Sequence, residues 1–318
     1  MRKDITFLIN SSEITAGTRG ASLGPGAVIT AARTLKNNFF GNYNLVYLED
    51  NNNVLDASSN FEFAKNAEAL LDVYQRISTA LGEVFSANQF PFVLAGDHGS
   101  AGGTIAGIKK QFPDKRLGVV WIDAHGDIHS PYTTPSGNMH GMPLSTALNS
   151  DNLNSKVNSI SEEEKHVWDA LKELHGIVPK IHPEDLIFIG VRDLEEQEIN
   201  IIEELKIRNV LVEEVRSKGE GTIIQEVLSH LNACDLIYIS FDVDSMDPDI
   251  TSYGTGTPVK NGLFPQEVLT IMKGIIASNK VCCLEVVEVN PCLDDKKNKM
   301  AEITFEIVED LVKKIESI

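Results

Sequence analysis

Residues 119–127 read VVWIDAHGD, a stretch in which an apolar run passes directly into acidic and histidine residues. A continuous apolar run is typical of a strand that is buried on both faces of a parallel sheet. Ligands bind such sheets at the carboxyl ends of the strands. The stretch therefore predicts a buried parallel strand that delivers Asp123, His125 and Asp127 to a binding site.

Two further segments show the same change from apolar to polar residues. Residues 93–98 read VLAGDH, and residues 239–248 read ISFDVDSMDP. Because parallel strands end at the same edge of a sheet, we expect His98, Asp242 and Asp244 to lie near the polar end of the first stretch. If the chain stays extended, residues two apart also point to one side, which would align Asp123, His125 and Asp127.

Around these segments, short β-branched and aromatic runs alternate with longer helical patterns. The expected strands are Ile5–Asn10, Asn44–Leu48, Pro91–Ala95, Leu117–Asp123, Leu186–Gly190, Val210–Val215, Leu236–Asp242 and Val281–Val289. The expected helices are Pro25–Leu35, Phe61–Ser86, Ile105–Gln111, Glu162–Leu174, Gly221–Leu231, Pro265–Ala277 and Met300–Ile315. This alternation predicts an α/β fold of three layers, with helices on both faces of a mainly parallel sheet of about eight strands. We expect residues 1–318 to form one catalytic domain, a size near the upper limit of a single core.

The composition excludes several classes of partner. The 318 residues include 28 Lys and Arg against 46 Asp and Glu, a formal net charge of −18. Such a chain repels nucleic acid phosphates and anionic lipid surfaces, whereas a small cationic substrate remains compatible with it. No apolar run approaches the roughly 20 residues of a membrane span, and the apolar segment after Met1–Lys3 is too short for a secretory signal. The four cysteines contain no CxxC pair, so we expect a reduced, cytoplasmic protein.

The three polar strand ends together supply a set of candidate metal ligands. These are His98, Asp123, His125, Asp127, Asp242 and Asp244. Carboxylates in contact raise one another's pKa and cannot all ionise, and divalent cations remove that repulsion. Oxygen donors with some imidazole suit manganese or magnesium, and six residues with shared carboxylates can hold two ions around a hydroxide. Taken singly, each motif also fits a turn, a helix cap or a hydrogen-bonded structural histidine.

At these residues the chain resembles the ureohydrolase family, and within it the arginases. Further matching stretches are SGNMHGMP at 136–143, GVRD at 190–193, TGTP at 255–258 and EVNP at 288–291. The resemblance implies a parallel-sheet α/β fold and two Mn²⁺ per chain. It implies hydrolysis of the guanidinium group of L-arginine to urea and L-ornithine by a metal-bridging hydroxide. It also implies a homotrimer or homohexamer.

The resemblance assigns roles to individual residues. His98, Asp123, Asp127 and Asp242 would bind one ion, and His125, Asp123, Asp242 and Asp244 the other. Glu288 would pair with the substrate guanidinium, and His140 would carry protons to the leaving amine. Asp127 is counted with these two among the catalytic residues. Without the resemblance, His140 also fits a capping loop histidine and Glu288 a structural ion-pair partner.

The resemblance places the substrate-binding residues on two loops and beside the metal motifs. They are His129, Ser136, Asn138, Glu195 and Thr257. The chain departs from the arginase pattern at His129, where Asn is expected, at Glu195, where Asp is expected, and at Gly99, where Ser is usual. The alternatives left open are agmatinase, another guanidino-acid ureohydrolase, formiminoglutamase, and a metal-binding or interaction protein without catalysis.

Overall fold

Eight parallel strands form the central sheet of the computed structural model, which describes residues 4–318. Met1–Lys3 lie outside the described residues. The strands are β1 (Ile5–Asn10), β2 (Asn44–Leu48), β3 (Phe90–Ala95), β4 (Leu117–Ile122), β5 (Leu186–Ile189), β6 (Arg208–Val210), β7 (Leu236–Asp242) and β8 (Val281–Val287). They lie in the order β2-β1-β3-β8-β7-β4-β5-β6. The predicted fold class, an α/β fold of three layers, is confirmed.

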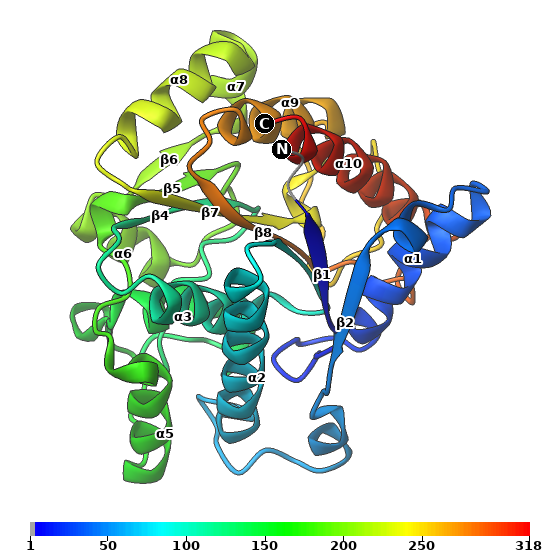
Figure 1. Cartoon of the computed structure of the whole chain (residues 1–318). Coiled ribbons are helices and arrows are strands. Elements are labelled where there is room, and N and C mark those ends of the chain that lie inside the picture. The colour runs from blue at the N-terminus through cyan, green and yellow to red at the C-terminus, as the bar shows by residue number, and fades with distance from the viewer. Residues whose placement is uncertain (1–3) are drawn as a thin grey trace.

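Helices cover both faces of this sheet (Figure 1). One apolar layer packs beneath α1 (Gly24–Thr34), α7 (Val212–Lys218), α8 (Glu220–His230), α9 (Pro265–Ile276) and α10 (Lys299–Glu316). The opposite layer packs beneath α2 (Ala67–Ser86), α3 (Ala101–Gln111), α4 (Pro143–Leu148), α5 (Glu162–Lys172) and α6 (Glu196–Leu205). Every residue of the inner strands β3 and β4 is buried, because each strand carries apolar side chains on both faces.

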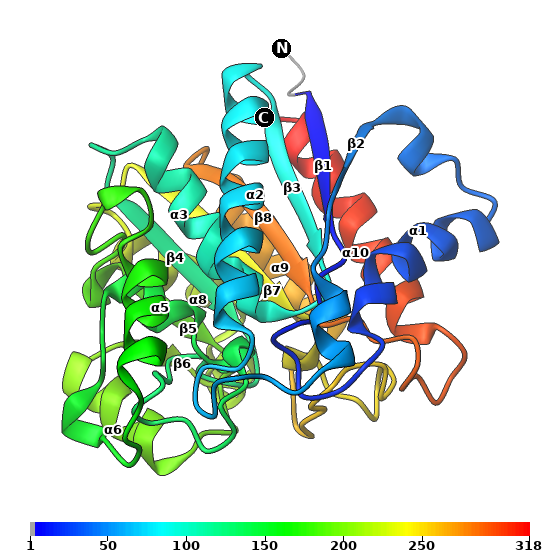
Figure 2. The same ribbon diagram turned by 90° about the horizontal axis from the view of Figure 1, so that it is seen from below.

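The strand order brings the polar strand ends together. β3, β8, β7 and β4 are consecutive neighbours in the sheet, although they come from distant parts of the sequence. Figure 2 shows these four strands running side by side through the middle of the molecule. Their carboxyl ends therefore share one edge, as expected for a ligand site on a parallel sheet. No helix among residues 4–318 has the length and apolar character needed to cross a membrane.

Three expected elements were wrong in their type or bounds. The helix expected from Ile105 begins at Ala101. The expected strand Val210–Val215 is instead the end of β6 followed by helix α7. The spacing between its valines is two residues and then three, so it does not keep the alternation of a strand. The carboxylate of Glu214 also accepts the Leu211 N–H at 3.1 Å, a contact that favours the start of a helix. The helix expected from Phe61 begins only at Ala67. Two short helices after loops that border the site, α4 and α6, are not among the predicted elements.

Candidate metal centre and active site

The first group of candidate ligands surrounds His98, directly after β3. Its Nδ1 atom lies 3.0 Å from a carboxylate oxygen of Asp123, 3.0 Å from Asp127 and 3.2 Å from Asp242. The other ring nitrogen lies 2.7 Å from the Ser240 hydroxyl. The ring also stacks on Trp121, with centroids 4.0 Å apart. These contacts fix the imidazole so that Nδ1 faces the carboxylates.

The turn before His98 depends on glycine. A Cβ atom at Gly96 would lie 2.3 Å from the Ser12 carbonyl oxygen, so any larger residue would push β3 away from the adjoining loop. A Cβ atom at Gly99 would lie 2.4 Å from the Thr15 hydroxyl oxygen. The space of the serine usual at position 99 is thus filled by Thr15, which accounts for that departure.

The second group surrounds His125. Its Nδ1 atom lies 3.0 Å from the carboxylate of Asp244 and 3.5 Å from Oδ1 of Asp123. Asp123 therefore faces both histidines, with Oδ2 towards His98 and Oδ1 towards His125. The amide of Asp244 donates to Asp242 Oδ1 at 2.8 Å, which turns Asp242 Oδ2 towards His98. All six predicted ligands thus come together in two groups that share Asp123.

The reason expected for this convergence was wrong in one respect. β4 ends at Ile122 and the chain bends from Asp123 onward, so the segment is not extended. Asp127 has a φ of +47°, a left-handed conformation that Asp tolerates better than most residues. This bend, and not strand alternation, sends Asp127 to His98 and His125 to Asp244.

The electrostatics of these residues fit bound cations. Burial, and next the charge of Asp123, raise the pKa of Asp127 to about 6. Burial, followed by Asp244 and Asp123, raises the pKa of Asp242 well above its ordinary range. Nδ1 of His98 and Oδ2 of Asp123 are buried and lie 3.0 Å apart, but neither atom has a neighbour among the described residues in the geometry of a hydrogen bond. Repelling carboxylates and unbonded donor atoms, with no cysteine among them, are what a site for divalent cations requires.

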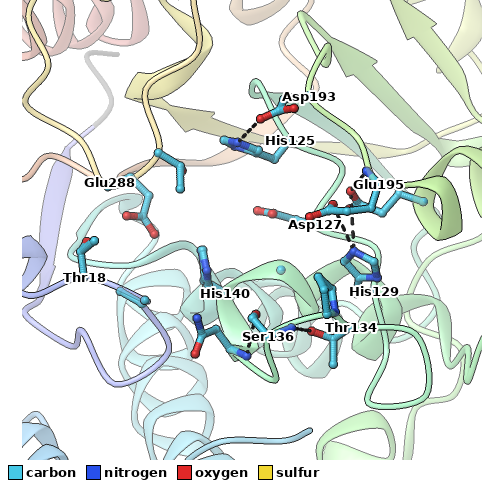
Figure 3. A pocket seen from close by; sticks show the side chains of 18 of the residues that line it. Thr18, His125, Asp127, His129, Thr134, Ser136, His140, Asp193, Glu195 and Glu288 are labelled. Carbon is cyan, nitrogen blue, oxygen red and sulfur yellow. Dashed lines mark hydrogen bonds and ion pairs between the residues drawn. The ribbon is translucent and has the colours of Figure 1, made fainter. Parts of the chain in front are cut away.

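A cavity of about 480 Å³ opens beside the two ligand groups. Figure 3 labels ten of the residues that line it, with Glu288 and Thr18 on one side and His129 and Glu195 on the other. Most of the predicted site residues line it: His125, Asp127, His129, Ser136, Asn138, His140, Glu195, Thr257 and Glu288. The remaining predicted residues, His98, Asp123, Asp242 and Asp244, lie in the ligand groups behind this lining.

Glu288 is held at the inner end of the cavity by the backbone. It follows β8 with a φ of +66°, and its N–H donates to the Gly96 carbonyl at 3.0 Å. Its Oε1 accepts the His98 N–H at 2.9 Å. Burial, and next the carboxylate of Asp97, raise the pKa of Glu288 to about 8. A neighbouring cation would restore the charged form, so this carboxylate is suited to a guanidinium partner.

His140 lies between Glu288 and the opposite wall, on the short 3₁₀ turn Met139–Gly141 (Figure 3). Burial, followed by the nearby His125 and His98 imidazoles, lowers the pKa of His140 to about 4. The ring is therefore neutral near pH 7 and can accept a proton.

Two of the three departures from the arginase pattern, His129 and Glu195, meet at the outer wall of the cavity. His129 Nε2 lies 3.3 Å from the Glu195 carboxylate, and Nδ1 lies 3.0 Å from the Thr133 hydroxyl. Glu198, one turn into α6, lies 3.8 Å from the same Nε2 atom. Glu198 is not among the residues predicted from the sequence, although its spacing of three residues from Glu195 at a helix start was a signal for it.

The remaining predicted substrate-binding residues differ in their contacts. The Ser136 hydroxyl accepts the Asn138 N–H at 3.2 Å, and both side chains border the cavity. The Thr257 hydroxyl donates to Asp244 at 3.2 Å, so this residue touches a candidate ligand as well as the cavity. Thr18 and Asp193 also line the cavity but were not selected from the sequence.

Comparisons with known proteins agree with this geometry. The family model described as "Arginase family" matches residues 4–313. An arginase of Bacillus subtilis (strain 168) is 34% identical over 314 residues, 99% of each chain. Arginase-1 of Homo sapiens is 36% identical over 237 residues, which are 74% of this chain and 69% of that protein. The native structure of the Bacillus caldovelox arginase matches with a TM-score of 0.80 and 31% identity, over 98% of each chain. The chain therefore belongs to the arginase family and is a metal-dependent hydrolase that acts on the amidine bond of guanidino compounds.

Proposed function

We propose that this enzyme hydrolyses the guanidinium group of L-arginine to urea and L-ornithine with two Mn²⁺ ions. The observation that carries the proposal is the position of Glu288, a buried carboxylate that shares one cavity with both candidate ligand groups. A guanidinium bound to Glu288 would thus have its carbon beside the metal centre.

The two groups of ligands support a pair of ions. We assign His98, Asp123, Asp127 and Asp242 to one ion, and His125, Asp123, Asp242 and Asp244 to the other. When bound, such ions supply Lewis-acid charge that makes water a nucleophile at neutral pH. The mixture of carboxylate oxygens and imidazole nitrogens favours manganese over metals that prefer thiolates.

The side chains of the chain itself bind the substrate and move protons. Glu288 offers two oxygens to the planar guanidinium, which fixes the orientation of its carbon. His140 stands within the same cavity and would pass a proton to the departing amine. Ser136 and Asn138 would donate hydrogen bonds to the α-carboxylate of the substrate. Glu195 would accept a hydrogen bond from its α-amino group. Thr257 would hold the Asp244 carboxylate in place through its hydroxyl. We further propose a cytoplasmic homotrimer or homohexamer, to be checked by light scattering on the purified protein.

The test is urea release by the Mn²⁺-loaded enzyme from L-arginine, agmatine and 4-guanidinobutyrate, with metal content measured on the same sample. We expect urea from arginine and two metal equivalents per chain. Glu288→Gln should abolish most urea release while both equivalents remain bound, because Glu288 contacts the His98 backbone and not the metal-facing atoms. A fully loaded enzyme that releases no urea from any of the three substrates would overturn the proposal.

A further inference from the structure

The ring of His129 has no free nitrogen to offer a substrate. Nε2 faces the carboxylate of Glu195 at 3.3 Å, and Nδ1 faces the Thr133 hydroxyl at 3.0 Å. The ring is also buried, with only 5% of the residue exposed. A shorter side chain at position 129 would not span these two partners. His129 is therefore engaged by the protein on both sides, even though it borders the cavity.

Glu195 is the partner that this contact restrains. Its side chain is 53% exposed and stands at the rim, where it contacts the His129 imidazole and Glu198 in the first turn of α6. The contact with His129 is the main reason that the pKa of Glu195 falls to about 2. Glu198 lies behind the same nitrogen with 2% exposure. The outer end of the cavity thus presents a fixed, charged carboxylate backed by a second one.

The charges along the cavity favour a substrate that is cationic at both ends. Among the residues that line it, the carboxylates outside the candidate ligand set are Asp193, Glu195, Glu198 and Glu288. No Lys or Arg lines the cavity in the part of the chain that the structure describes. A substrate carboxylate would find only neutral donors such as Ser136 and Asn138, opposite the charged carboxylate of Glu195.

We propose that His129 is a positioning residue that holds Glu195 for the distal ammonium group of the substrate instead of binding its carboxylate. The cavity then discriminates weakly between an amino acid such as arginine and the corresponding guanidino alkylamine without the carboxylate, agmatine. The enzyme accepts both classes. This inference rests on the proposed function, since it concerns the specificity of the same cavity.

The first experiment compares kcat and KM for L-arginine and agmatine in the Mn²⁺-loaded wild-type enzyme and in His129→Asn. Asn is the residue expected here from the family pattern, and its free amide can donate to a carboxylate. One charge-assisted hydrogen bond gained by arginine should raise the arginine-to-agmatine ratio of kcat/KM about tenfold. The variant should change the KM values for arginine and agmatine and leave kcat within about twofold, because His129 lies outside the ligand groups.

A second variant changes Glu195, the other residue of the same contact. Glu195→Asp shortens the carboxylate by one methylene and frees Nε2, so it should shift the ratio in the same direction. Because both changes break one contact, the double variant should be clearly less than additive. His166→Asn, at an exposed position of α5, is the matched control and should leave the ratio unchanged.

The outcomes separate the inference from the proposed function. A ratio that stays within twofold in both variants, or an agmatine KM that is unchanged in His129→Asn, overturns the positioning role. Three bound metal equivalents in the wild type, falling to two in His129→Asn, also overturn it, because a cation would then occupy the place between His129, Glu195 and Glu198. Absence of urea from both substrates in the loaded wild type contradicts the proposed function itself.

Discussion

At the residue scale, the candidate site depends on side chains held in uncommon backbone conformations. Asp127 has a φ of +47° and Glu288 a φ of +66°, and both point into the cavity. Left-handed conformations are costly for residues other than Gly, Asn and Asp, so the surrounding contacts must maintain them. For Glu288 those contacts are two hydrogen bonds: its N–H donates to the Gly96 carbonyl, and its side-chain Oε1 accepts the His98 N–H.

Replacement of Asp127 should remove one metal ion. Its carboxylate lies 3.0 Å from His98 Nδ1 and belongs to only one of the two ligand groups. Asp127→Asn keeps the size and the tolerance for positive φ but removes the charge, and we expect metal analysis to fall from about two equivalents to about one. The surface variant Asp114→Asn should retain the full content. Two full equivalents in Asp127→Asn would contradict the ligand assignment.

Replacement of His140 should slow turnover without loss of metal. The side chain lines the cavity, yet it forms no part of either ligand group. For His140→Ala we expect kcat to fall by about 10²–10⁴, as for other general acid–base residues. The measurement is steady-state urea release together with metal content. An unchanged kcat would exclude His140 from proton transfer.

At the scale of the elements, local side-chain contacts decide how β6 passes into α7. Arg208 donates to the carboxylate of Glu214 at 2.9 and 2.7 Å, and the Leu211 N–H donates to the same group at 3.1 Å. The carboxylate thus links the strand to the first turn of the helix. It is the reason that the valines after Val210 continue as a helix.

Glu214→Gln should therefore destabilise the protein in a pH-dependent way. Contact with Arg208 lowers the pKa of Glu214 from 4.5 to about 2. A lowered folded-state pKa stabilises the fold above pH 4.5, and that stabilisation is lost as the pH falls towards 2. We expect the variant to lose about 1 kcal/mol of unfolding free energy at pH 7 and much less near pH 3, as measured by urea denaturation. A difference that grows on acidification would contradict this account.

At the scale of the whole molecule, the metal centre links four strands that are distant in the sequence. Its candidate ligands follow β3 and β4 or lie at the end of β7, and Glu288 follows β8, so their repulsion acts across the middle of the sheet. Bound cations would relieve that repulsion and stabilise the folded state by mass action.

Removal of divalent cations should accordingly lower the thermal midpoint. After chelation and dialysis we expect Tm to fall by about 5 °C or more in calorimetry, and added Mn²⁺ should restore it. Asp127→Asn should show a smaller response to Mn²⁺ than the wild type. A midpoint that is independent of metal would mean that the ligand residues hold no ion in the folded protein.

Much of this architecture could be predicted because it depends on local patterns. The apolar runs identified the strands to within two residues except at β6, where valines fit both a strand and a helix. The polar strand ends identified all six candidate ligands, since a parallel sheet places such ends at one edge. The short helix α4 was missed because all six of its residues are buried, so its sequence shows no amphipathic pattern.

The sequence by itself therefore determined the fold class, the candidate ligands and the resemblance that named Glu288 and His140. Only the tertiary structure decided how these residues meet: Asp123 is shared by both histidines, and a bend after Ile122 directs Asp127. It also decided that His129 faces Glu195 and not the cavity alone. The physical reason is that residue types and strand ends are encoded locally, whereas the direction of a side chain depends on contacts between segments far apart in the chain.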